Sequence, residues 1–291
     1  MVRTAARCLM PFLGILWWTA AGAAQVTLTD VPYGAGSYQR LDLSVPAGKG
    51  FPTVIFIHGG SLTSGDKADD DYRDVCKPFA GAGIGCASVN YRLAPAAPWP
   101  AQPEDVAGAV AWVHDSIGAY GGDPHRLFLL GHSSGALLVA LMGADGHFLA
   151  RHGLKPGDLR GVMPMGSIMW DEDLEEAVNR YGRDSMEQRF ARDPDTRLFG
   201  SFDAYRGLWP IRHVGAGMPP FLFLIAEGER VNPPVLKTDS VFAERARALG
   251  NQADYRILPG RTHMTAIRRF SEPGDPTFAI VREFIRRGAE D

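Results

Sequence analysis

The pentapeptide Gly-His-Ser-Ser-Gly at 131–135 is the strongest chemical signal in the chain, because it separates two apolar runs. A G-x-S-x-G pattern between a strand and a helix predicts a nucleophile elbow, a tight turn that exposes a serine hydroxyl above a sheet. The residues two before and two after the nucleophile must be small in such a turn. Gly131 and Gly135 flank Ser133 in this way, whereas Ser134 has larger neighbours. Ser133 is therefore the predicted nucleophile, and a serine-glycine loop that only caps a helix is the alternative.

A serine hydroxyl is a weak nucleophile until a base takes its proton, and a carboxylate must hold that base in one tautomer. His263 is the predicted base, because it follows the last large apolar runs closely enough to lie in a loop at the carboxyl edge of a sheet. His147 and His152 lie on or just beyond the helix that follows the elbow. His213 precedes the strand that is expected to carry the acid.

A glycine-containing turn, His-Gly-Gly-Ser at 58–61, directly follows the apolar run at 53–57. Glycines at this place let backbone N–H groups approach a substrate oxygen without interference from side chains. The amides of Gly59 and Gly60, together with the amide of Ser134, are therefore predicted to stabilise an oxyanion. An ordinary glycine turn is the alternative.

Hydrophobic patterning predicts the elements that position these groups. Two alternating segments without a helix between them predict antiparallel edge strands, and five short continuous apolar runs predict parallel strands buried on both faces. The expected strands are 26–31, 39–45, 53–57, 85–89, 127–130, 161–165, 221–225 and 255–258, and the expected helices are 71–80, 104–117, 134–151, 237–249 and 276–287. This alternation predicts an α/β fold with a mostly parallel, doubly wound sheet.

One connection, at about 167–218, is too long for a simple crossover and is rich in aromatic and charged residues. Long insertions over the carboxyl end of such a sheet commonly form lids, so a lid is expected here. Its aromatic content suggests an apolar or aromatic acyl or alcohol group, although aromatic residues in a lid also pack against one another. The acidic cluster at 171–176 is expected to be the solvated start of a helix.

Composition limits the class of protein. A chain of 291 residues with 45% hydrophobic residues favours one large core over two. The net charge of −3 and the lack of a long Lys or Arg run disfavour a nucleic-acid partner. The histidines are scattered, without a His-Glu-x-x-His or paired Cys-x-x-Cys pattern, so no metal site is expected.

Residues 1–24 have the order of a secretory signal peptide: two arginines, an apolar stretch at 9–18, then small residues at 20–24. The apolar stretch is too short to span a bilayer comfortably. Cleavage near residue 23 or 24 is therefore expected, leaving a domain at 25–291 that is exported to the periplasm or secreted without a stable membrane anchor. An uncleaved membrane tether is the alternative.

Export would leave Cys76 and Cys86 as the remaining cysteines in an oxidising compartment, where they could pair. A helix packed on a sheet usually keeps its backbone too far from a strand for a bridge, except near the connecting loop. The sequence leaves this disulfide open.

Five motifs occur in the order and rough spacing of one enzyme group. They are His58-Gly59-Gly60, Asn90-Tyr91-Arg92-Leu93-Ala94-Pro95, Pro103-Glu104-Asp105-Val106, Gly121-Gly122-Asp123-Pro124-His125-Arg126 and the pentapeptide at 131–135. Through them, nearly everything after the N-terminal segment resembles the esterase branch of the α/β-hydrolase superfamily, which includes hormone-sensitive-lipase-like carboxylesterases, the feruloyl-esterase-like group and kynurenine formamidases. The resemblance implies an α/β-hydrolase fold with helices on both faces of the sheet. It also implies a serine hydrolase that cleaves a small-molecule carboxylic ester through an acyl-enzyme on Ser133, without a cofactor.

The resemblance also points to the acid of the triad. Family members usually read Pro-Pro-Phe-Leu-Leu-Leu-His-Gly-Glu-x-Asp after the seventh core strand, with the aspartate as the acid. The segment 219–229 ends here in Glu-Gly-Glu, so Glu229 falls on the aspartate without a gap. Glu227 and Asn232 are the competing registers. Asp105 is expected to support the fold.

Two other functions remain open at this point. Amide hydrolysis, as in arylformamidases or exopeptidases of this fold, passes through the same kind of tetrahedral intermediate and is not separated by the sequence from ester hydrolysis. A hydrolase-like scaffold that only binds is a third interpretation, and the missing aspartate is its sole support. The sequence specifies neither the natural substrate nor the oligomeric state.

Overall fold

The computed structural model describes residues 26–167, 169, 172–192, 198–230 and 235–290. The predicted signal peptide at 1–24 and the alternative acid Asn232 lie outside the described residues.

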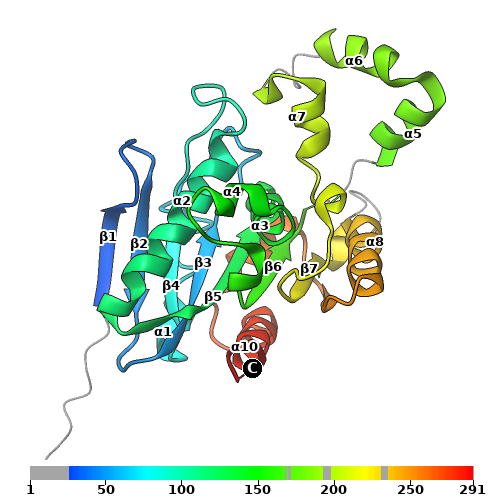
Figure 1. Cartoon of the computed structure of the whole chain (residues 1–291). Coiled ribbons are helices and arrows are strands. Elements are labelled where there is room, and N and C mark those ends of the chain that lie inside the picture. The colour runs from blue at the N-terminus through cyan, green and yellow to red at the C-terminus, as the bar shows by residue number, and fades with distance from the viewer. Residues whose placement is uncertain (1–25, 168, 170–171, 193–197, 231–234, 291) are drawn as a thin grey trace, which may run out of the picture.

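The core of the molecule is an eight-stranded sheet in the order β1-β2-β4-β3-β5-β6-β7-β8 (Figure 1). The strands are β1 (Val26–Pro32), β2 (Arg40–Val45), β3 (Phe51–Ile57), β4 (Gly85–Val89), β5 (Gly122–His132), β6 (Gly161–Met165), β7 (Phe221–Ala226) and β8 (Ala253–Leu258). β2 pairs antiparallel with both β1 and β4, and the remaining neighbours are parallel. The predicted mostly parallel sheet with antiparallel strands at one edge is confirmed.

Helices cover both faces of the sheet, as predicted. Successive side chains of a buried strand point to opposite faces, so Ile55 and Leu129 belong to one apolar cluster and Phe56 and Leu130 to the other. The first cluster includes residues of α2 (Ala101–Ser116), α3 (Ser134–Ala144), α4 (Gly146–Ala150) and α8 (Val235–Ala248). The second includes residues of α1 (Lys77–Gly81), α9 (His263–Arg268) and α10 (Pro276–Glu290). Short 3-10 turns lie at η1 (Ile117–Tyr120), η2 (Pro156–Asp158), η4 (Pro210–His213) and η5 (Glu227–Glu229).

Two predicted helices differ from the structure. The prediction of a helix at 71–80 is wrong over its first half, because these residues form turns. Helix α1 begins only at Lys77. Pro78 lies in its first turn, where the missing N–H of proline is tolerated. The helix expected at 134–151 breaks at Asp145, which is extended at φ −102° and ψ 106°. The Asp145 carboxylate accepts the N–H of His147 and caps α4 instead.

The connection from β6 to β7 holds α5 (Glu172–Tyr181), α6 (Arg183–Arg192) and α7 (Phe202–Gly207), which we call the cap. Figure 1 shows α5 and α6 standing away from the sheet. A small apolar cluster of its own, centred on Met186 and Phe202, holds the cap together. Where the cap returns to the main body, the ring of Phe199 lies 5.9 Å from that of Trp99.

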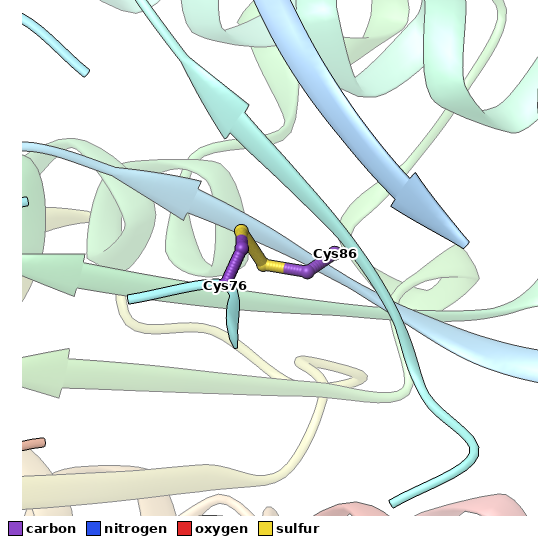
Figure 2. The surroundings of a disulfide bond; sticks show 2 residues. All are labelled: Cys76 and Cys86. Carbon is purple, nitrogen blue, oxygen red and sulfur yellow. A yellow bond between two sulfur atoms is a disulfide. The ribbon is translucent and has the colours of Figure 1, made fainter. Parts of the chain in front are cut away.

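Cys76 and Cys86 form a disulfide, with their Cα atoms 5.5 Å apart (Figure 2). Cys76 immediately precedes α1 and Cys86 lies on β4. The bridge therefore spans the short connection between a helix and the next strand, where such a bond is geometrically allowed. Across the described ranges, no helix is both long and apolar enough to cross a bilayer.

Candidate active site

The strand register brings the predicted site residues to one edge of the sheet. Ile57 at the end of β3 pairs with Gly131, and His132 at the end of β5 pairs with Met165 at the end of β6. Further along the sheet, β7 and β8 end together at Ala226 and Leu258. Because parallel strands share this edge, the oxyanion turn, the elbow, the acid and the base all emerge on the same side.

Ser133 occupies a strained turn between β5 and α3, with φ 55° and ψ −125°. A Cβ on Gly131 would lie 2.3 Å from the carbonyl oxygen of Gly135, and a Cβ on Gly135 would lie 2.2 Å from that of Ile57. Both contacts are far too short for any side chain, which is the crowding that singled out Ser133 in the sequence. The Ser133 amide donates to the carbonyl oxygen of Met165 at 2.9 Å and ties the elbow to β6.

Glu229 and His263 form a hydrogen-bonded pair, with Nδ1 of the imidazole 2.5 Å from Oε1 of the carboxylate. Glu229 is 2% exposed and lies in the η5 turn directly after β7. Its second oxygen accepts the N–H of Ala226 at 3.1 Å, which fixes the carboxylate. His263 opens α9, and its ring uses Nδ1 for this bond, so Nε2 is left for a nucleophile's proton.

Glu227, the competing acid, does not take this place. Its carboxylate accepts the N–H of Gly260 at 2.9 Å and is solvent-exposed. The structure thus brings Glu229, and not Glu227, to His263.

Gly166 lies against two of the three predicted triad residues, Glu229 and His263. A Cβ there would lie 3.0 Å from Oε1 of Glu229 and 3.1 Å from Nδ1 of His263. The preceding residue, Met165, accepts the amide of Ser133. The acid–base pair therefore lies directly beside the elbow.

The predicted oxyanion turn lies against the elbow. A Cβ on Gly59 would lie 2.8 Å from the Cβ of Ser133, so only glycine allows this approach. Gly60 has φ 121°, which also favours glycine. The Ser134 hydroxyl accepts the N–H of Leu62 at 3.3 Å and links the turn to α3.

Two further side chains at this edge, Tyr72 and His132, were not identified from the sequence. His132 is fully buried beside the base, with its ring centroid 4.6 Å from that of His263. Burial, and then the neighbouring charge of His263, lower the pKa of His132 to about 3. Its position inside the pentapeptide was visible in the sequence, but no spacing pointed to Tyr72.

A second buried carboxyl group lies near the acid. Asp239 on α8 is 1% exposed, and burial followed by the charge of Glu229 raises its pKa well above the ordinary range. Burial therefore favours the protonated form of Asp239, whereas the Glu229 carboxylate is bound by His263 and by the Ala226 amide.

Asp105 is a structural residue, as expected. Its carboxylate accepts from Arg92 and from Gln39, each at 2.7 Å, and is 2% exposed. Within the described part of the chain, no group of three His, Cys, Asp or Glu residues is arranged to hold a metal ion.

Comparison with known proteins identifies relatives over most of the chain. Esterase LipC of Mycobacterium tuberculosis is 31% identical over 272 residues, covering 86% of this chain and 63% of LipC. The chain thus spans less than two thirds of the length of this curated relative.

Solved structures show the same fold. A truncated form of a carbohydrate esterase from gut microbiota has a TM-score of 0.70 at 19% identity, covering 94% of this chain and 99% of that one. The propionate-bound esterase Est2 of Thermogutta terrifontis has a TM-score of 0.68 at 21% identity, covering 92% and 94%. The BD-FAE family model matches residues 41–238, more than half of the chain. The chain belongs to the BD-FAE family of α/β hydrolases.

Proposed function

We propose that the protein is a serine hydrolase that cleaves carboxylic esters of small molecules. The Glu229–His263 pair beside the strained elbow of Ser133 is the observation that carries this proposal. The names of relatives, among them Esterase LipC and carboxylic ester hydrolase LipN of Mycobacterium tuberculosis, support ester chemistry.

The proton steps follow from the geometry of the pair. Nε2 of His263 takes the proton of Ser133 as its oxygen attacks the ester carbonyl, and Glu229 stabilises the imidazolium that forms. The imidazolium then gives its proton to the departing alcohol, which leaves an acyl group on Ser133. Water repeats the sequence with the same base and frees the acid.

Negative charge develops on the carbonyl oxygen in both steps. The amides of Gly59, Gly60 and Ser134 are proposed to hold this oxygen, because the two glycines follow β3 beside the elbow and Ser134 opens α3. Prearranged N–H donors of this kind stabilise the transition state more than the ground state.

Substitution of the nucleophile tests the proposal. Ser133→Ala should lower kcat on p-nitrophenyl acetate by about 10⁴-fold or more and abolish labelling by a fluorophosphonate. Ser240→Ala, on α8, is the matched control and should label and turn over as the parent does. Unchanged turnover in Ser133→Ala would refute the assignment.

A substrate panel tests the chemical class. Acyl esters graded in length should be turned over faster than aryl formamides and amino-acid arylamides, and the reverse order would assign the site to amide hydrolysis. The third interpretation, a scaffold that only binds, depended on the missing triad aspartate. Glu229 supplies a carboxylate to His263 in its place.

We further propose that the protein is exported. The basic, apolar and small order of residues 1–24 motivates this proposal, and the Cys76–Cys86 disulfide fits an oxidising compartment. Fractionation of producing cells, with mass determination of the N-terminus, should find the chain outside the cytoplasm and beginning near residue 25. An intact N-terminus in the cytoplasmic fraction would contradict export.

A further inference from the structure

A set of buried contacts connects the oxyanion turn with the backbone of the base. The Tyr72 hydroxyl lies 2.7 Å from the position of a Cβ on Gly59 and 3.2 Å from Nδ1 of His132. Nε2 of His132 lies 3.0 Å from the carbonyl oxygen of His263. Tyr72 is 7% exposed and His132 fully buried, so solvent does not compete for these bonds.

The partners fix the direction of each hydrogen bond. A carbonyl oxygen only accepts, so Nε2 of His132 carries the proton and donates to His263. Nδ1 of the neutral ring is then an acceptor, and the Tyr72 hydroxyl donates to it. The low pKa of His132 agrees with this single neutral tautomer.

We propose that Tyr72 and His132 are positioning residues that hold the base His263 and the oxyanion turn in register with Ser133. This inference rests on the proposed hydrolase function. Neither side chain carries out a chemical step. His132 holds the backbone of His263 through a hydrogen bond to its carbonyl oxygen, and Tyr72 holds His132.

The topology explains why such a pair is needed. The oxyanion turn follows β3, the elbow follows β5 and the base follows β8, so no hydrogen bonds of one strand pair join all three. His132 is the residue next to the nucleophile and contacts the base directly, and Tyr72 contacts both His132 and Gly59. Displacement of a catalytic group by about 1 Å can cost about 100-fold in rate.

The neutral state of His132 also matters for the charge of the site. His263 must become a cation during each proton transfer, and a second cation with its ring 4.6 Å away would oppose that step. Because the buried ring of His132 stays neutral, it forms a hydrogen bond to His263 without placing a second positive charge beside it.

Removal of one hydroxyl group gives the first test. Tyr72→Phe keeps the ring, which packs 5.9 Å from the rings of Phe56 and His58, and deletes only the hydrogen-bonding group. We expect kcat on p-nitrophenyl acetate to fall between about 10- and 100-fold, with KM within about twofold. Tyr33→Phe is the matched control, because it too deletes a tyrosine hydroxyl that donates a hydrogen bond, here to the backbone carbonyl of Asn90, outside this set of contacts.

A pair of substitutions at His132 gives the second test. His132→Gln keeps an N–H donor that can reach the His263 carbonyl, whereas His132→Leu has none. We expect His132→Gln to retain at least about tenfold more kcat than His132→Leu, at a temperature well below both midpoints of thermal unfolding. The double variant Tyr72→Phe/His132→Leu should be no slower than His132→Leu alone, because the effect of Tyr72 on the base passes through His132.

The outcomes separate this inference from the proposed function. Loss of activity in Ser133→Ala together with unchanged kcat in Tyr72→Phe would leave the hydrolase standing and overturn the positioning role. Lowered midpoints of unfolding with unchanged kcat in both Tyr72→Phe and His132→Gln would assign the pair to stability alone. Retained activity in Ser133→Ala would contradict both the proposed hydrolase function and the positioning role of Tyr72 and His132.

Discussion

The carboxylate of Glu229 divides its two oxygens between two partners. Oε1 meets Nδ1 of His263, and Oε2 accepts the amide of Ala226 three residues earlier in the η5 turn. The turn folds the side chain back toward the end of β7. The additional methylene of glutamate is therefore taken up locally, and the charge reaches the imidazole without a change in the sheet.

Two substitutions at Glu229 separate the charge from the length of the side chain. Glu229→Gln keeps the length but removes the charge and favours the wrong tautomer of His263, so kcat should fall by about 10³- to 10⁴-fold. Glu229→Asp keeps the charge but withdraws the carboxylate by about one C–C bond, or roughly 1.5 Å, and a smaller loss is expected. Ester hydrolysis should be measured beside the control Glu227→Gln. A larger effect at residue 227 than at 229 would contradict the assignment.

Acid should weaken the fold through His132. Burial lowers the pKa of His132 to about 3 from 6.5, so between these values the unfolded chain binds a proton that the folded chain does not. Stability therefore falls as the pH drops through this window, by at most about 1.4 kcal/mol per pH unit from this one residue. The free energy of unfolding, measured with urea between pH 7.5 and 4, should fall less steeply with falling pH in His132→Gln than in the parent protein. Parallel plots of this free energy against pH for the two proteins would contradict the low pKa.

Local sequence predicted Ser133, His263 and the glycines around them, because their requirements are steric and lie within a few residues. The choice among Glu229, Glu227 and Asn232 depended on the conformation of one turn, which patterning does not supply. The contact between Tyr72 and His132 joins residues 60 positions apart, and no short motif predicts it.

At the scale of elements, hydrophobic runs located the strands well, because strands buried on both faces must be apolar throughout. The helices were harder to predict where a single side chain overrides the pattern. Pro78 lies in the first turn of α1, which begins at Lys77, and Asp145 follows the end of α3 and caps α4 with its carboxylate. The short helix α9, which carries His263 and is capped by Thr262, was not predicted, because six residues leave too little periodicity.

The disulfide should stabilise the connection between α1 and β4. It closes a loop with a sequence separation of 10, for which the loss of chain entropy in the unfolded state corresponds to about 3 kcal/mol. The variant Cys76→Ala/Cys86→Ala should unfold at a temperature lower by roughly 5 °C or more. A thiol reductant should lower the midpoint of the parent protein but not that of the variant, and equal sensitivity in both would show that the bond is not formed.

For the whole molecule, the alternation of strands and helices was enough to predict the doubly wound sheet, and the sheet determines where the site lies. All the predicted site residues follow strands whose carboxyl ends share one edge. The predicted insertion between β6 and β7 contains the cap, whose packing depends on side chains that meet only after folding. Met186 and Phe202 form a buried cluster of their own, which Tyr205 connects to the first cluster on the sheet.

Because Met186 and Phe202 are buried among residues of the cap and, of the residues that the structure describes, only Tyr205 packs against both their cluster and the first sheet cluster, the cap should unfold without the sheet. Phe202 is 2% exposed, and Phe202→Ser should open the cap, increase tryptic cleavage in α6 and leave the main thermal transition within about 2 °C of the parent protein. Leu129→Ala, in the sheet core, should instead cost about 2–5 kcal/mol of global stability. Hydrolysis of an acetyl ester should survive in Phe202→Ser, because Glu229 and His263 follow the sheet strands β7 and β8 and lie outside the cap. An equal drop in the main transition for both variants would mean that cap and sheet unfold as one unit.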